Sequence, residues 1–141
     1  MQMKKYEEII QNNIDDVLFY KNGISEMLLE ETENRLKITL GSQLKSYLSK
    51  YGYVYFKWIE LYGITENQGL NSDLISKTLN LREKFNLPNN YICIENLGDG
   101  DFIVCDEFDN IAEFHIGNTS LNKSNIKFDD YLEKRFLEGI C

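Results

Sequence analysis

Residues 33–63, with the sequence ENRLKITLGSQLKSYLSKYGYVYFKWIELYG, decide the fold of this chain. Their middle part carries an apolar stripe at positions i, i+3, i+4 and i+7, the spacing of one helix face, formed by Leu44, Tyr47, Leu48 and Tyr51. Gly52 follows directly and can take the left-handed conformation that ends a helix. The residues after it are rich in aromatic side chains, which favour strands. The stretch therefore predicts a helix and then strands at 53–60 and 59–62.

The rest of the chain adds helices on both sides of a strand-rich middle. Before the stretch, the patterns predict a helix at 4–11, a strand at 17–20 and a helix at 26–38. After it, they predict a polar loop at 65–72, a helix at 74–85, strands at 91–96, 101–106 and 111–116, and a helix at 128–138. Tight turns between the three later strands make them antiparallel neighbours. The predicted fold class is α+β, a central mainly antiparallel sheet with helices packed around it.

Capping residues mark several of the predicted boundaries. Ser25 can accept a hydrogen bond at the start of the helix 26–38, and Ser42 is expected to do the same for the helix after it. Ser72 or Asp73 is the expected cap of the helix 74–85. Gly139 is expected to end the last helix. No linker or repeat interrupts the pattern, so we expect one domain over residues 1–141, with 1–23 as its N-terminal helical extension.

Composition narrows the classes of function. The chain has 141 residues, of which 43% are apolar, and its net charge is −8 because 15 basic residues face 23 acidic ones. An acidic chain is unsuited to bind nucleic acid directly, since phosphate binding needs a basic surface. A basic protein partner fits better, because complementary fields speed encounter. No apolar run reaches the roughly 20 residues of a membrane span, and the N-terminus lacks a signal-peptide pattern. We expect a cytoplasmic protein.

The stretch also resembles the SMI1/KNR4 (SUKH) superfamily. The family pattern is E-x-x-L, L-P, K-x-F-L, Y-G and E-I-Y-G, and it is matched by Glu33, Leu36, Leu40, Lys45, Tyr47, Leu48, Tyr51, Gly52, Glu60, Leu61, Tyr62 and Gly63. Residues 94–101 resemble the family's polar, Gly-rich hairpin, and 128–132 resemble its final helix. The resemblance covers about residues 24–137. It departs from the family at one point, where Gly41 replaces the usual proline.

The resemblance implies a function that the residues alone do not. Many bacterial members of the superfamily are immunity proteins, so the chain is expected to bind and neutralise a cognate toxin, for example a nuclease, by covering its active surface. It is then no enzyme, needs no cofactor, and has a basic protein toxin as its partner. The alternative is a regulatory interaction module, because eukaryotic relatives are tied to cell-wall synthesis and signalling. The sequence leaves the oligomeric state open.

Catalytic and metal sites have little support in the residues. The single histidine, His115, lies in a predicted strand without a nucleophile motif nearby, so a role on the sheet surface is favoured. A group of carboxylates could be turn residues, metal ligands or an acidic rim for a basic partner. The spacing does not fit an EF-hand, and we expect no metal. As partner-binding candidates we keep Asp99, Asp101, Asp106, Glu107 and Asp109.

The aromatic residues after Gly52 are the second group of candidates. Strand alternation sends Val54 and Phe56 to the core face. It sends Tyr53 and Tyr55 to the other face. Together with Trp58 these two tyrosines are the expected interface residues, because Tyr and Trp are favoured at binding hot spots.

The cysteines are odd in number and show no C-x-x-C spacing, so we expect buried, reduced thiols. With a three-residue turn at 98–100, Glu95 would lie opposite Ile103. Cys93 would then lie opposite Cys105 on the same face of the hairpin.

Overall fold

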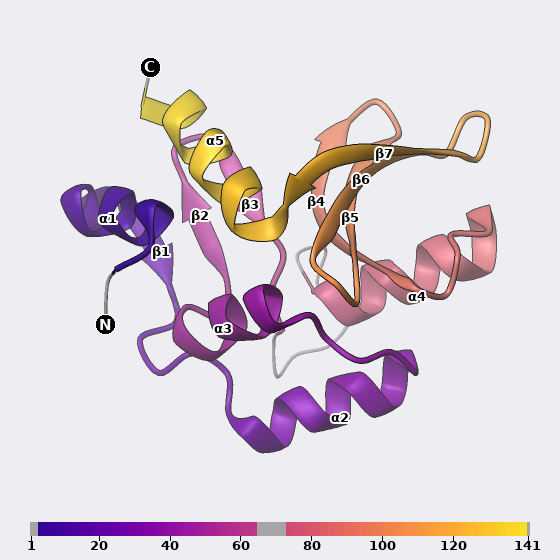
Figure 1. Ribbon diagram of the computed structural model, residues 1–141, viewed down its shortest axis with the longest axis horizontal. Coiled ribbons are helices and arrows are strands. Elements are labelled where there is room, and N and C mark those ends of the chain that lie inside the picture. The colour runs from indigo at the N-terminus through magenta and orange to yellow at the C-terminus, as the bar shows by residue number, and fades with distance from the viewer. Residues whose placement is uncertain (1–2, 65–72, 141) are drawn as a thin grey trace.

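The computed structural model describes residues 3–64 and 73–140. The predicted polar loop at 65–72 and Cys141 therefore lie outside the described residues. In chain order the elements are α1 (Lys5–Asn12), the 3-10 helix η1 (Ile14–Asp16), β1 (Val17–Phe19), α2 (Glu26–Leu36), α3 (Ser42–Lys50), β2 (Val54–Phe56), β3 (Ile59–Leu61), α4 (Leu74–Phe85), β4 (Tyr91–Gly98), β5 (Asp101–Asp106), β6 (Asn110–His115), β7 (Ser120–Lys127) and α5 (Phe128–Ile140) (Figure 1).

The strands form two antiparallel sheets, ordered β1-β2-β3 and β4-β5-β6-β7. The sheets meet where the backbone N–H of Tyr62 donates to the carbonyl of Ile94 at 2.8 Å. The expected α+β class is confirmed, with the difference that the strands divide into two sheets. Residues 3–23 supply α1, which packs against α5, and β1, which is an edge strand of the first sheet.

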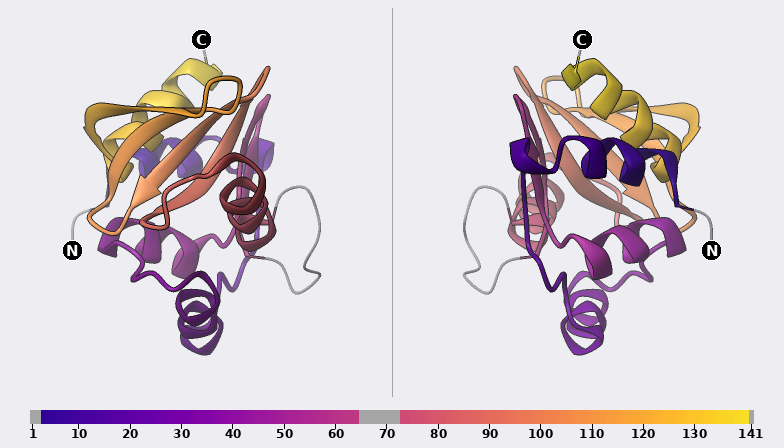
Figure 2. Two further views of the ribbon diagram at one scale, coloured as in Figure 1. Left: turned by 90° about the vertical axis from the view of Figure 1, so that its right-hand side faces the viewer. Right: turned by 90° about the vertical axis from the view of Figure 1, so that its left-hand side faces the viewer.

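Helices cover both faces of the four-stranded sheet (Figures 1 and 2). On one face, Lys77 of α4 lies over the ring of Phe102, 4.9 Å from its centroid. On the other, Arg135 of α5 bonds Glu95, which lies opposite Ile103. Phe102 and Ile103 are neighbours in β5 and point to opposite faces, so α4 and α5 lie on opposite faces too. A strand such as β4, apolar on both faces, is thus covered within the chain.

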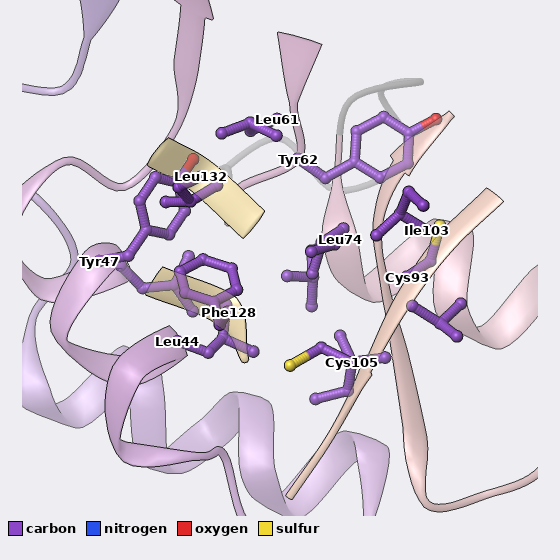
Figure 3. Close-up of a cluster of buried hydrophobic side chains, with 14 of the residues drawn as sticks. Leu44, Tyr47, Leu61, Tyr62, Leu74, Cys93, Ile103, Cys105, Phe128 and Leu132 are labelled. Atoms are coloured by element: carbon purple, nitrogen blue, oxygen red, sulfur yellow. The ribbon is translucent and has the colours of Figure 1, made fainter. Parts of the chain in front are cut away.

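The predicted stripe of α3 is buried in one hydrophobic core that joins both sheets and the five α-helices, and Figure 3 shows part of it. Leu44, Tyr47 and Leu48 are almost completely buried, and the ring of Tyr47 packs on that of Phe128 from α5. Each such side chain contributes about 1.5–3 kcal/mol by leaving water. The bounds of α4 agree with the prediction, and Asp73 caps it by accepting from the backbone N–H of Ser76.

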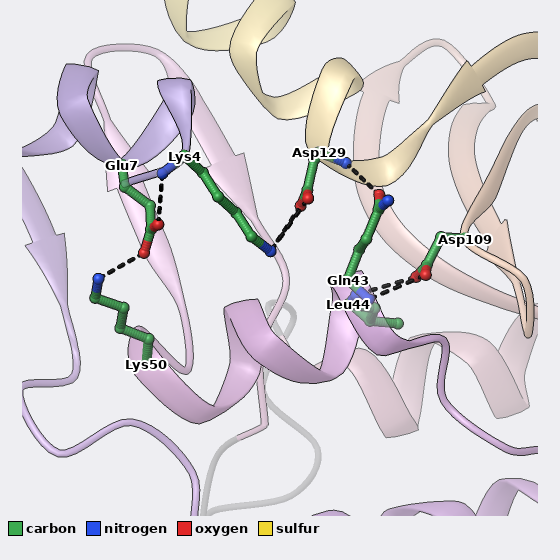
Figure 4. Close-up of polar contacts among 7 residues, drawn as sticks. All are labelled: Lys4, Glu7, Gln43, Leu44, Lys50, Asp109 and Asp129. Carbon is green, nitrogen blue, oxygen red and sulfur yellow. Dashed lines mark hydrogen bonds and ion pairs between the residues drawn. The ribbon is translucent and has the colours of Figure 1, made fainter. Parts of the chain in front are cut away.

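The start of α3 differs from the prediction. Ser42 is the first helical residue and does not cap the helix. Instead the two carboxylate oxygens of Asp109, in the turn after β5, accept from the backbone N–H groups of Gln43 and Leu44 at 3.0 Å each (Figure 4). Asp109 is buried as a result, so the expectation that it belongs to an exposed acidic rim is wrong.

The β4–β5 hairpin also differs from the prediction. Its turn has two residues, Asp99 and Gly100, both with positive φ, so Gly98 rather than Leu97 lies opposite Asp101. Glu95 lies opposite Ile103 as expected, but a bulge at Ile94 shifts the register beyond it.

The bulge separates the two cysteines that were expected to face each other. Cys93 lies opposite Val104 and Cys105 lies opposite Ile92, so the two thiols point to opposite faces of the sheet. Both are free and completely buried, as expected.

Two features near the C-terminus were not predicted. The edge strand β7 has the sequence SLNKSNIK, whose few apolar residues are only partly buried, so it lacks an alternating signal. Gly139 lies inside α5 and does not end it. A Cβ atom there would be 2.9 Å from Cδ1 of Ile59, so glycine allows the close approach of α5 to β3.

Candidate protein-binding surface

The three-stranded sheet is buried on one face and open on the other. Its inward side chains join the core, among them Val54 and Phe56 as predicted. The outward positions follow from the register, in which Leu18 lies opposite Tyr55 and Tyr55 lies opposite Glu60. With Trp58 from the turn between β2 and β3, the outward side chains define what we call the open face: Leu18, Tyr20, Tyr53, Tyr55, Trp58 and Glu60.

The open face exposes large apolar side chains. Leu18 is 67% exposed, Trp58 is 58% exposed and Tyr55 is 42% exposed. A sheet face that meets only water normally carries polar residues, and a cluster of exposed apolar side chains marks an interaction site. The structure thus brings the predicted candidates Tyr53, Tyr55 and Trp58 together on one surface.

Sequence reasoning missed three members of the open face, namely Leu18, Tyr20 and Glu60. The first two come from β1 and the loop after it, far from the aromatic stretch in the chain. Alternation in a three-residue strand is too short a signal to place them.

A ring contact and a hydrogen bond hold Tyr53 in position on the open face. The rings of Tyr20 and Tyr53 stack, with centroids 5.7 Å apart. The hydroxyl of Tyr53 donates to Oε2 of Glu60 at 2.5 Å. Burial and this bond to a carboxylate raise the pKa of Tyr53 above its usual range, so the hydroxyl stays protonated at neutral pH. Tyr53 and Glu60 therefore hold each other in place on the surface.

Trp58 rests on a buried ion pair. The guanidinium of Arg135 lies over the indole, 4.6 Å from its centroid. The same guanidinium donates through Nε and Nη2 to Oε2 of Glu95 at 2.8 and 2.7 Å. The hydroxyl of Tyr131 donates to Oε1 of Glu95 at 2.5 Å. Burial raises the pKa of Glu95, while the bonds from Arg135 and Tyr131 oppose that rise.

A groove of about 730 Å³ adjoins the open face. The turn at Trp58, β3 at Glu60, β4, α4 and α5 form its walls. Aromatic rings, amides and charged groups line these walls together, which suits a polar ligand with an apolar part.

The acidic candidates lie elsewhere and do not form one rim. Asp99 and Asp101 are at one end of β5, while Asp106, Glu107 and Asp109 are at the other. The strand has six residues, so its ends are about 17 Å apart.

Asp106, at that second end, is occupied by its own turn. Its carboxylate accepts from the backbone N–H groups of Phe108 and Asn110 and from the side chain of Asn110. Of the five acidic candidates, Asp99 and Glu107 are exposed.

His115 lies between two carboxylates on the surface of the four-stranded sheet. Its Nδ1 is 2.6 Å from Oδ1 of Asp101, and its Nε2 is 3.7 Å from Oε1 of Glu113. Within residues 3–64 and 73–140, only these three side chains bring ligand atoms close enough to share a metal ion. Each ring nitrogen already faces a carboxylate, so an ion pair accounts for the arrangement. The bond to Asp101 raises the pKa of His115.

Residues 3–137 match the SMI1-KNR4 cell-wall family, SUKH_5. Because the match covers nearly the whole chain, the protein belongs to this family. The match begins at residue 3, so it includes α1 and β1, which the motifs recognised in the sequence did not reach. None of the curated proteins matches the chain. In the part of the chain that the structure describes, no helix is long and apolar enough to cross a membrane.

Proposed function

We propose that this protein is an immunity protein that binds a cognate bacterial protein toxin and neutralises it. The observation that carries the proposal is the open face, where Leu18, Tyr55 and Trp58 are exposed together on a sheet face that residues 3–64 and 73–140 leave uncovered. Membership of the SMI1-KNR4 family supports it, since bacterial members often act in immunity.

The proposed mechanism is steric. The open face docks on the toxin and covers its active or substrate-binding surface, without a reaction or cofactor of its own. Exposed Tyr55 and Trp58 act as anchors, because aromatic side chains bury much area with little loss of conformational freedom. The net charge of −8 favours a basic toxin, and nucleases have such surfaces because they bind phosphates. The producing cell's cytoplasm is the proposed site of action.

A regulatory interaction module is the second candidate. The matched family is described by a link to the cell wall, which favours a role in a host pathway rather than in toxin neutralisation. Both candidates use the open face to bind a protein. They differ in the partner, so the gene neighbourhood separates them: a toxin gene beside this one favours immunity.

Co-expression tests the immunity proposal. Cells that express the adjoining toxin should survive when this protein is present and die when it is absent. Tyr55→Ala and Trp58→Ala should each reduce survival. Phe108→Ala is the matched control, because Phe108 is an exposed aromatic residue too, at 67%, but lies in the β5–β6 turn, outside the open face. Cell death despite expression of the folded wild-type protein contradicts the proposal.

A further inference from the structure

The groove beside the open face has the composition of a site for a guanidinium group. The rings of Tyr55 and Trp58 line one part of it, and the carboxylate of Glu60 stands next to Tyr55 in the adjacent strand. Guanidinium groups bind to such sites because they stack on aromatic faces while their N–H groups donate to carboxylates in the ring plane.

The chain already contains one example of this recognition. Arg135 stacks on Trp58 and donates two bonds to Glu95, an aromatic ring and a carboxylate used together. Tyr131 bonds Glu95, and Glu95 bonds Arg135, which lies against Trp58 in the wall of the groove. The indole is therefore held in place before a partner binds. A preordered ring loses less conformational entropy on binding.

The charges of the groove leave one carboxylate for a ligand. Arg135 is paired with Glu95. Lys77, the other cation in the lining, lies over the ring of Phe102 and keeps its charge, so the site depends on the position of Glu60 next to Tyr55 and not on an excess of negative charge. Among the described residues that line the groove, Glu60 is the only carboxylate without an ion-pair partner. Its Oε2 accepts from Tyr53, which leaves Oε1 to accept from a ligand.

We propose that this groove binds an arginine side chain of the protein partner. The guanidinium stacks on the exposed ring of Tyr55 beside Trp58 and donates to Oε1 of Glu60. The source of the arginine, a basic toxin, rests on the function proposed above, while the guanidinium site itself rests on the groove alone. Lysine fits less well, because its ammonium group is a compact, strongly hydrated charge that does not stack.

The sequence supplies its own reporter for this site. Trp58 is the only tryptophan of the chain, so both the intrinsic tryptophan fluorescence and the single indole N–H signal in an NMR spectrum report on the groove. N-acetyl-arginine amide is the probe. N-acetyl-citrulline amide, which has nearly the same shape without the charge, is its control, and N-acetyl-lysine amide tests the preference for a guanidinium.

The arginine probe should shift both signals saturably at millimolar concentration, and the two control compounds should bind at least several-fold more weakly. Glu60→Gln should weaken binding of the arginine probe roughly tenfold, because it replaces a charged hydrogen-bond acceptor with a neutral one. Glu113→Gln, at a partly buried carboxylate outside the groove, should leave binding unchanged. Equal binding of citrulline and arginine, an unaffected Glu60→Gln variant, or absence of saturation in both signals overturns the proposal. The titration needs no toxin, so its failure is separate from a failure of rescue in cells.

Discussion

Gly41 lies directly against the carboxylate of Asp109: a Cβ atom on Gly41 would be 2.2 Å from Oδ1. The contact explains why this chain has glycine where the family usually has proline. The backbone of Gly41, with φ −63° and ψ 153°, would suit proline, so the side chain and not the backbone is excluded. Asp109 needs the space because it caps α3, and its own carbonyl accepts from the N–H of Phe128 at the start of α5.

Asp109→Ala should lower the free energy of unfolding by about 2–4 kcal/mol, since it removes a helix cap and leaves buried N–H groups unpaired. Urea unfolding measures the loss. Glu107→Ala is the control, because Glu107 is exposed in the same turn. Equal stability of the two variants contradicts the capping role.

Gly41→Ala should destabilise the protein by about 1–3 kcal/mol, as overpacking does. The added methyl must push the Asp109 carboxylate away from Gln43 and Leu44. In an Asp109→Gly background the same substitution should cost much less, because the clash is gone. A double-mutant cycle from thermal or urea unfolding measures this coupling, and additive effects would refute it.

Neither Cys93 nor Cys105 should react rapidly in the folded protein. Both thiols are buried, and burial raises the pKa of each, so little of the reactive thiolate forms. In a Cys141→Ser variant, Ellman's reagent should label both remaining thiols rapidly once the protein is unfolded. In the folded protein it should label each of them much more slowly. Fast labelling of either in the native state would contradict the burial.

His115 should titrate above the ordinary histidine value, because Asp101 accepts from its ring. It is the only histidine, so one NMR signal reports its pKa. A pKa raised by folding means that the pair stabilises the fold below about pH 6.5, and that this contribution is lost as pH rises through the folded pKa. Asp101→Asn should lower the pKa and reduce the pH dependence of stability. An unchanged pKa in this variant would rule out the pairing.

The sequence predicted elements whose signals are local. The stripe of α3, the cap at Asp73 and the inward residues Val54 and Phe56 all depend on spacing within one element, and the structure agrees with each. The place of Tyr53 and Tyr55 on one surface followed from the same alternation, whereas Trp58, in the turn between β2 and β3, was proposed because tryptophan is favoured at binding sites.

Features that depend on distant contacts could not be predicted in this way. Asp109 was expected at the surface because its partners, Gln43 and Leu44, lie 66 and 65 residues earlier in the chain. The prediction that Cys93 and Cys105 face each other was wrong because of a bulge at Ile94, and a run of apolar residues gives no sequence signal for a bulge.

The groove beside the open face also depends on distant contacts. It requires Arg135 and Glu95, 40 residues apart, to meet beneath Trp58. Neither residue stands in a motif that joins them.

Comparing Trp58→Ala with wild type tests the central claim most directly, in binding to the toxin domain encoded beside this protein. Isothermal titration calorimetry should give at least a tenfold loss of affinity, since exposed aromatic anchors contribute about 2 kcal/mol or more. The melting temperature of Trp58→Ala should stay close to that of the wild type. Phe56→Ala, in the core, should lower the free energy of unfolding by about 3–5 kcal/mol. Absence of binding by the wild-type protein, or equal affinity of wild type and a folded Trp58→Ala variant, would contradict the account.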